Sequence, residues 1–338
     1  MPETTIILLF LVVLLALAFD FINGFHDSAN AIATSVLTRA LSMRNAVLLA
    51  AILNFVGAIM WTGVAQTIGK GIVNPSLVSG HIGQVLVLAT LIGAITWNLI
   101  TWWKGLPSSS SHALIGALIG AAVAASAGTS SLEGEGIAKV FTSLIFSPIA
   151  GFIAGSALMV LIMNIFAQQA PSKLNRHFKV LQVASAGFMA FTHGSNDAQK
   201  SMGIITLALV VGGFLPSVEI PTWVKISCAL AMALGSAAGG WRIIKTVGKK
   251  VMGLQPVHGF ASETAAALVV LMATLWHAPV STTHVVSSSI MGVGTVKSAS
   301  AVRWGIVRQI VMAWLLTLPI SALLGAGCFY LLHFAIRG

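Results

Sequence analysis

The chain has 338 residues, of which 57% are hydrophobic and only 8% are charged, whereas soluble domains carry roughly 25% charged residues. This composition excludes an ordinary soluble protein and predicts that most of the chain lies in lipid. The net charge of +10 is therefore attributed to the orientation of membrane segments and not to nucleic-acid binding.

The first predicted span, Thr5–Ala18, continues into a polar island that reads Gly-Phe-His-Asp-Ser-Ala-Asn at residues 24–30. No Lys or Arg precedes the span, so we do not expect a cleaved signal peptide. Gly24 lies where apolar sequence meets polar residues, and we expect the helix to unwind there and free its carbonyl groups. The oxygens of Asp27 and Asn30 would then suit a hard cation or a proton.

Two apolar stretches, Val47–Val64 and Val85–Ile100, lead to a hairpin with the sequence Pro-Ser-Ser-Ser-Ser-His at residues 107–112. Proline and hydroxyl residues are typical of a helix's first turn, where unpaired N–H groups and the helix dipole attract anions. Ser109 and Ser110 are therefore candidate ligands of a tetrahedral oxyanion. The alternative is that these hydroxyls only cap the turn.

The second half of the chain repeats both patterns. Gly-Ser-Asn-Asp-Ala-Gln-Lys occupies residues 194–200, and Pro-Val-Ser-Thr-Thr-His occupies residues 279–284. The aspartates are offset by 197 − 27 = 170 and the prolines by 279 − 107 = 172. Two unrelated patterns with one spacing indicate two duplicated halves, residues 1–168 and 180–338, joined by a cytoplasmic loop at 169–179. Repeated membrane chains with interrupted helices are typical of transporters.

The second-half copies predict equivalent roles for their residues. Asn196 and Asp197 would form a second cation site, and Ser281 and Thr282 a second oxyanion site.

Two acid–base candidates have no identical counterpart in the first half. Lys200 occupies the position of Asn30, and an ammonium beside Asp197 could replace a bound metal ion or titrate with the carboxylate. Alternatively, Lys200 extends to the membrane surface. Glu263 precedes an Ala/Leu/Val run and is a further candidate ion or proton site.

The basic residues predict a membrane orientation. With the N-terminus outside, all but five of the 18 basic residues fall in predicted cytoplasmic segments, as the inside-positive bias requires; the five are Lys70, Lys139, Lys200, Lys225 and Arg337. Counting each hairpin as one crossing gives about ten crossings, five per half. An odd number per half makes the repeats inverted. We expect an all-α polytopic membrane protein with broken helices, re-entrant hairpins that meet near the midplane, and both termini outside.

These motifs resemble the inorganic phosphate transporter (PiT) family, whose repeated signature pairs Gly-x-Asn-Asp-x-x-Asn with Pro-x-Ser-Thr-Thr-His. The second hairpin matches throughout, the first is a serine-rich version, and the resemblance covers nearly the whole chain. It implies a secondary transporter, not an enzyme, that takes up inorganic phosphate across the plasma (inner) membrane without a cofactor and as a homodimer. The resemblance implies that Ser109, Ser110, Ser281 and Thr282 are phosphate ligands. It also implies that Asp27, Asn30, Asn196 and Asp197 form the cation sites.

The chain departs from the family signature at two positions. His26 and Lys200 stand where the signature has asparagines. Such forms resemble the bacterial low-affinity branch, which implies proton coupling and a substrate that can include phosphate complexed with a divalent metal. We therefore expect proton symport, with sodium symport as the alternative.

Three other functions compete with phosphate symport. A sulfate permease of the same fold would bind another tetrahedral oxyanion. An intramembrane hydrolase is disfavoured because four consecutive serines define no single nucleophile. A channel would only equilibrate its substrate. No Walker-type motif is present, so nothing in the sequence indicates ATP as the energy source.

Overall fold

The computed structural model describes residues 3–78, 80–126, 128–238 and 252–337, and its regular structure within them is helical apart from one isolated bridge between Val73 and Leu132. The elements are α1 (Glu3–Leu37), α2 (Met43–Met60), α3 (Gly63–Gly71), α4 (Gly80–Lys104), α5 (Ser110–Ser126), α6 (Gly134–Ile165), α7 (Pro171–Val211), α8 (Thr222–Ala238), α10 (Pro256–Leu275), α11 (Thr282–Lys297), the 3₁₀ turn η1 (Ala299–Ala301) and α12 (Trp304–Arg337).

Six helices in the described residues, namely α1, α2, α4, α6, α10 and α12, are long and apolar enough to cross a membrane. This confirms the predicted all-helical, multi-span class, while the larger number of about ten crossings stays a prediction. Four basic residues assigned to the cytoplasmic side, Arg242, Lys245, Lys249 and Lys250, lie outside the described residues.

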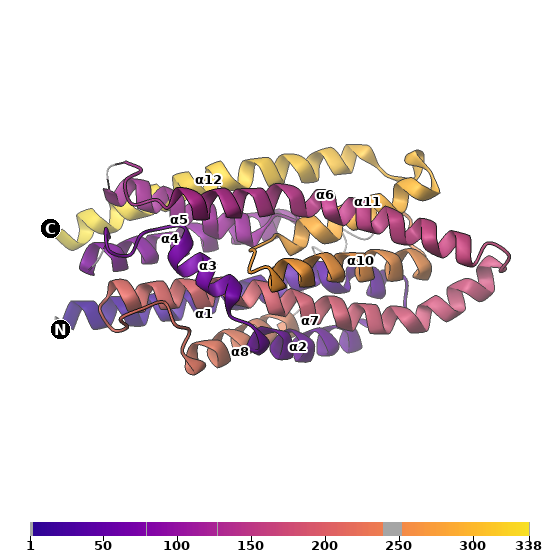
Figure 1. Cartoon of the computed structure of the whole chain (residues 1–338), viewed down its shortest axis with the longest axis horizontal. Helices are drawn as coiled ribbons and strands as arrows, with labels where there is room; N and C mark the ends of the chain where they lie inside the picture. The colour runs from indigo at the N-terminus through magenta and orange to yellow at the C-terminus, as the bar shows by residue number, and fades with distance from the viewer. Residues whose placement is uncertain (1–2, 79, 127, 239–251, 338) are drawn as a thin grey trace.

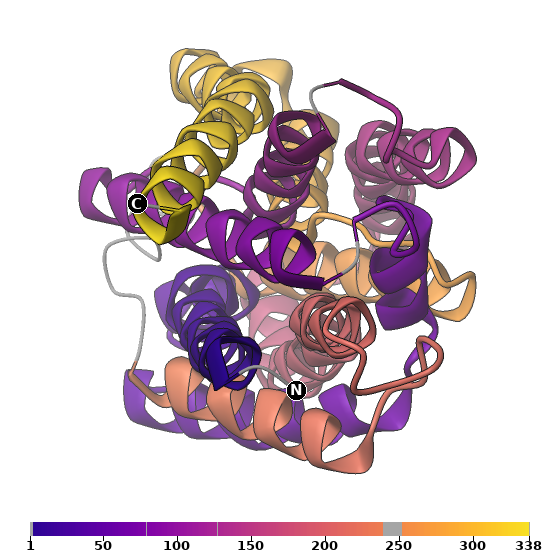
Figure 2. The same ribbon diagram turned by 90° about the vertical axis from the view of Figure 1, so that its left-hand side faces the viewer.

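Most of the helices run along the long axis of the molecule (Figure 1). The start of α1 and the end of α12 lie at the same end of the bundle, which faces the viewer in Figure 2. Both termini therefore share one side of the molecule.

The predicted breaks at the two glycine islands are wrong. Helix α1 continues through Gly24, and α7 continues through Gly194. The glycines are instead points of close helix packing: a Cβ at Gly24 would lie 2.4 Å from the Met232 carbonyl oxygen, and one at Gly194 would lie 2.2 Å from that of Asn54. Small residues let membrane helices approach in this way, so the polar side chains beside the glycines are held on continuous helices.

The two hairpins turn in the same manner. Gly105 follows α4 with φ +64°, and His277 follows α10 with φ +57°. The next residue in each turn donates its amide back to the helix: Leu106 to the Thr101 carbonyl at 2.9 Å, and Ala278 to the Ala273 carbonyl at 2.8 Å. This left-handed C-cap reverses the chain just before each serine-bearing helix begins.

Each hairpin helix packs against the last helix of the other half. A Cβ at Gly120 of α5 would lie 1.9 Å from the Ala322 carbonyl oxygen of α12, and a Cβ at Gly292 of α11 would lie 2.2 Å from that of Phe152 in α6. The offsets are 292 − 120 = 172 and 322 − 152 = 170. The same contact thus occurs twice, with the halves exchanged, and it draws α5 and α11 into the interior.

Candidate functional site

Two aspartates lie on the long helices that carry the glycine islands, and each has a nitrogen partner. Asp27 of α1 receives a hydrogen bond from His26 Nδ1 at 2.6 Å. Asp197 of α7 lies 2.5 Å from Lys200 Nζ through Oδ1 and 3.4 Å from His193 Nε2 through Oδ2. All five side chains are buried. A carboxylate at such depth must be paired or protonated, and both aspartates meet that requirement.

The helices α5 and α11 begin with capped N-termini. Ser109 Oγ accepts a hydrogen bond from the His112 amide at 3.1 Å, and Ser281 Oγ accepts one from the His284 amide at 3.2 Å. This is the N-cap arrangement, so the alternative of a capping role describes these two hydroxyls as they stand. The remaining first-turn amides keep the positive end of each helix dipole directed at the same interior region.

The side chain of the residue that follows each N-cap serine lies next to an aspartate. Thr282 Oγ1 donates to Asp197 Oδ2 at 3.0 Å. Ser110 lies beside Asp27 in the corresponding position, although its hydroxyl forms no well-aligned hydrogen bond. The predicted oxyanion ligands and the predicted cation ligands are therefore neighbours, and they form one continuous polar region.

Contacts across the two halves bring the hairpin starts together. Lys200 Nζ donates to Ser111 Oγ and, at 2.9 Å, to the Val280 carbonyl. Ser111 Oγ donates to the same carbonyl at 3.0 Å. The start of α5 and the loop before α11 thus touch directly, with the ammonium between them.

The mirror-related contact joins Asn30 to the second hairpin. Asn30 Nδ2 donates to Thr283 Oγ1 at 3.0 Å. This pair corresponds to Lys200 and Ser111 by the offsets 200 − 30 = 170 and 283 − 111 = 172. Each half therefore extends a nitrogen donor from its long helix to the hairpin helix of the other half.

His26 and Asn196 occupy matching positions in the two halves. Each contacts the helix that precedes the hairpin of its own half, α4 for His26 and α10 for Asn196. His26 Nε2 lies 3.3 Å from Thr101 Oγ1, and Asn196 Nδ2 donates to Thr274 Oγ1 at 3.0 Å. Asn196 also fixes the loop before α11, because its Nδ2 donates to the Ala278 carbonyl at 3.2 Å and its Oδ1 accepts from the Val280 amide at 3.3 Å.

The rings of the two histidines that end the hairpin motifs contact each other at a tilt, and this contact was not predicted from the sequence. The ring centroids of His112 and His284 are 4.4 Å apart, and His284 stacks on Trp314 of α12 at 3.9 Å. Trp314 Nε1 donates to the Pro107 carbonyl at 3.2 Å. The repeated histidine was a signal that could have predicted this pair, whereas nothing in the sequence marks Trp314.

Sequence reasoning also missed the hydroxyls that receive the cross-half contacts. Ser111 and Thr283 occupy equal positions in the two hairpin motifs, so the repeat itself could have singled them out. His193 is not among the predicted site residues, yet its Nε2 lies 3.4 Å from Asp197 Oδ2 and its Nδ1 lies 2.9 Å from Asn54 Oδ1.

Glu263 of α10 belongs to a separate buried cluster. Its carboxylate accepts hydrogen bonds from Thr34 and Ser35 of α1, the latter at 2.5 Å, and from Ser185 and Gln182 of α7 at 2.5 and 3.4 Å. Within the part of the chain that the structure describes, no basic side chain forms an ion pair with it. Because the partners of this buried carboxylate are neutral, its negative charge is a candidate site for a proton or a cation.

The arrangement around Asp27 and Asp197 combines two opposite electrostatic features. Two helix N-termini and the Lys200 ammonium attract an anion, while the carboxylates beside them attract a cation or a proton. Because the region is buried, these attractions are weakly screened and depend strongly on which groups are charged.

Three comparisons place the chain among known proteins. A family model described as the phosphate transporter family matches residues 23–325. A probable low-affinity inorganic phosphate transporter of Bacillus subtilis (strain 168) is 51% identical over 332 residues, which cover 98% of this chain and 99% of that protein. A protein with the same description from Rhizobium meliloti (strain 1021) is 46% identical and covers 93% of each chain.

A solved structure gives the same similarity at the level of the fold. The structure described as the sodium-dependent phosphate transporter matches with a TM-score of 0.88 and 26% identity, over 97% of this chain and 99% of that one.

Proposed function

The chain belongs to the phosphate transporter family, and from this premise we propose that it takes up inorganic phosphate by proton symport. The observation that carries the proposal is the continuous polar region in which the N-termini of α5 and α11 meet Asp27, Asp197 and Lys200. Substrate and coupling ion would then bind in contact with each other, so that the charge of one changes the affinity for the other.

Phosphate would bind between the two helix N-termini. Ser109, Ser110, Ser281 and Thr282 supply hydroxyl donors there, and the first-turn amides supply the positive dipole ends. Two of these hydroxyls now cap their helices, and they can rotate toward an oxyanion because the anion replaces them as the acceptor for the amides.

Protons are favoured over sodium by the nitrogen partners of the carboxylates. Lys200 Nζ and His26 Nδ1 occupy positions beside Asp197 and Asp27 where a sodium ion would bind. A bound sodium ion would have to displace these groups, whereas a proton can be exchanged within each pair. Asn30, Asn196 and Glu263 complete the proposed coupling residues, with Glu263 as a separate buried proton site.

Sodium symport is the second candidate, because the similar solved structure is described as sodium-dependent. Phosphate uptake into proteoliposomes with an imposed pH gradient and no sodium decides between the two. Uptake that follows the pH gradient supports proton symport, and strict dependence on sodium overturns it.

The substrate has its own test. A sulfate permease of the same fold would also bind a tetrahedral oxyanion, but sulfate at neutral pH carries no proton. Competition by arsenate and not by sulfate supports phosphate as the substrate. A metal–phosphate complex as cargo would show as phosphate uptake that rises with added divalent metal.

The exchanged packing of α5 on α12 and of α11 on α6 supports two inverted repeats, residues 1–168 and 180–338, joined by the loop at 169–179. In this proposal the hairpins meet near the midplane, both termini lie outside the plasma (inner) membrane, and the repeats move against each other to alternate access. A homodimer is proposed from the family resemblance.

A further inference from the structure

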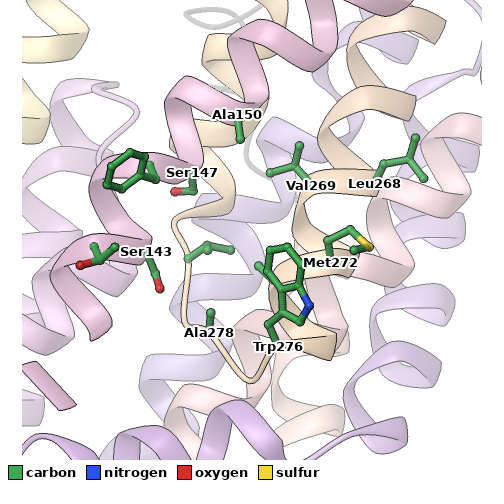
Figure 3. A pocket seen from close by; sticks show the side chains of 12 residues that line it. Ser143, Ser147, Ala150, Leu268, Val269, Met272, Trp276 and Ala278 are labelled. Carbon is green, nitrogen blue, oxygen red and sulfur yellow. The ribbon is translucent and has the colours of Figure 1, made fainter. Parts of the chain in front are cut away.

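A groove lies between the outer surfaces of α6 and α10. It has a volume of about 450 Å³, and its twelve lining residues include no charged side chain. Figure 3 shows side chains of the two helices facing each other across it, with the loop at Ala278 closing one side. The volume falls within the range of small-molecule sites.

The groove has a structural cause in α6. Gly151 and Gly155 hold this helix tightly against α11, since a Cβ at either position would lie within 2.6 Å of an atom of that helix. Pro148 lies inside α6, where a proline lacks the N–H for one backbone hydrogen bond of the helix. With α6 held close to α11 at these glycines, the groove lies on its other side, along α10.

The rim of the groove belongs to the surface that contacts lipid. Phe146 of α6, Met272 of α10 and Trp276, which directly follows α10, line the groove and are exposed, and both helices are among the membrane spans. The groove is therefore continuous with the protein–lipid interface. In the bilayer, an apolar chain has access to it, and no water is present to fill it.

One lining residue has an unsatisfied polar group. Ser147 is 5% exposed, and its hydroxyl has no hydrogen-bond partner among the described residues; Figure 3 shows it among the residues that line the groove. Serine in a helix normally donates to a preceding carbonyl. The Ser147 hydroxyl is thus one unsatisfied donor in a lining that is otherwise mostly apolar.

The inner wall of the groove is the loop that holds the candidate site. Ala278 and Val280 line the groove, while their carbonyls accept hydrogen bonds from Asn196 and Lys200. Only this loop separates the groove from the polar region. An occupant of the groove would therefore press on the loop from the side opposite Lys200.

We propose that the groove between α6 and α10 binds one acyl chain of a membrane phospholipid and that this chain supports the loop before α11. The uncharged lining and the continuity with the lipid-facing surface fit an acyl chain. This inference concerns lipid binding and is independent of which ion drives transport.

The test uses the full chain in proteoliposomes that contain phosphatidylglycerol with a diazirine in one acyl chain. After illumination, cross-links are mapped by mass spectrometry. We expect labelling of residues 142–150 and 268–280 above that of the exposed face of α1. Equal labelling on all lipid-facing surfaces would mean ordinary annular lipid and would overturn the proposal.

Ala150→Trp fills the groove from within and should reduce labelling at residues 268–280 about tenfold, because the indole takes the space of several methylene groups. Ile149→Trp is the matched control: this neighbouring residue is exposed on α6 but does not line the groove, and its labelling should match the unmodified protein. If Ala150→Trp does not fold, Ala150→Leu replaces it. Unchanged labelling in the folded variant contradicts the proposal.

A second measurement tests support of the loop. Adding phosphatidylglycerol to detergent-purified, delipidated protein should raise the melting temperature of the unmodified chain and of Ile149→Trp, and the rise should be smaller in Ala150→Trp. An equal rise in all three proteins shows that lipid acts elsewhere. Phosphate transport is not needed for either readout, so failure of the proposed function leaves this test intact.

Discussion

Lys200 of α7 donates a hydrogen bond to Ser111 at the start of α5, across 89 residues of sequence. Its Nζ also lies 2.5 Å from Asp197, so one ammonium links the aspartate of the second half to the hairpin of the first. The equivalent contact, Asn30 to Thr283, uses a neutral amide. The site is therefore nearly symmetric in geometry but asymmetric in charge.

The charge asymmetry gives the first prediction. Lys200→Asn restores the residue type found at the matching position and leaves the Asp197 carboxylate without its ammonium, a loss that costs about 3–5 kcal/mol for a buried pair. We expect uptake driven by a pH gradient to fall at least about tenfold and sodium to stimulate what remains. Uptake in proteoliposomes under each gradient is the measurement.

A folded Lys200→Asn protein with unchanged pH-driven uptake would show that the ammonium plays no part in coupling. Lys225→Asn is the matched control, because Lys225 lies in the first turn of α8, where the structure gives it no ion pair.

The aspartates should be required for coupled transport. In Asp27→Asn and Asp197→Asn an amide replaces the carboxylate without changing its size, so neither a proton nor a cation is held there. We expect both variants to lose phosphate uptake in a host that lacks its own phosphate uptake systems. Normal uptake by either variant, with expression confirmed, would remove that residue from the coupling site.

The N-cap serine should affect substrate affinity more than turnover. Ser281→Ala removes the cap of α11 and one proposed phosphate donor, a loss of about 1 kcal/mol or about fivefold in KM. Initial uptake rates over a range of phosphate concentrations give KM and Vmax separately. Ser227→Ala, on the exposed surface of α8, is the control and should change neither.

Glu263 should carry a coupled proton without binding phosphate. Glu263→Gln keeps the size of the side chain and can hydrogen-bond Thr34 and Ser185, but it cannot titrate. We expect loss of uptake driven by a pH gradient, while exchange of labelled for unlabelled phosphate at equal pH persists. If exchange is lost together with uptake, Glu263 serves structure or substrate binding instead. Glu219→Gln, in an exposed loop, is the control.

The glycine islands give a prediction about stability. Gly194→Ala places a methyl group 2.2 Å from the Asn54 carbonyl oxygen, and such overpacking costs about 1–3 kcal/mol. Gly327→Ala in α12 is matched, because beyond its own helix backbone no described atom lies within 4 Å of its new Cβ, and alanine favours a helix. We expect a lower melting temperature for the first variant only; equal temperatures would contradict the close packing of α7 on α2.

The amino-acid sequence alone determined the class and the chemistry of the region. A long apolar segment is more stable in lipid than in water, so the membrane helices could be predicted from hydropathy. The doubled motifs marked Asp27, Asp197 and the hairpin serines as chemically special. The capping of α5 and α11 was also predictable, because an N-cap depends only on residues within one turn.

Only the tertiary structure decided how these parts meet. A glycine can interrupt a helix or allow another helix to pack closely against it, and the neighbouring element decides which occurs. At Gly24 and Gly194 the backbone of another helix is in close contact. The contacts of Lys200 with Ser111 and with the Val280 carbonyl depend on where the fold places the start of α5 and the loop before α11, which no local pattern contains. For the same reason Glu263 fell into a separate cluster with α1 and α7: a buried polar group takes whichever donors the packing presents, however far apart they are in the sequence.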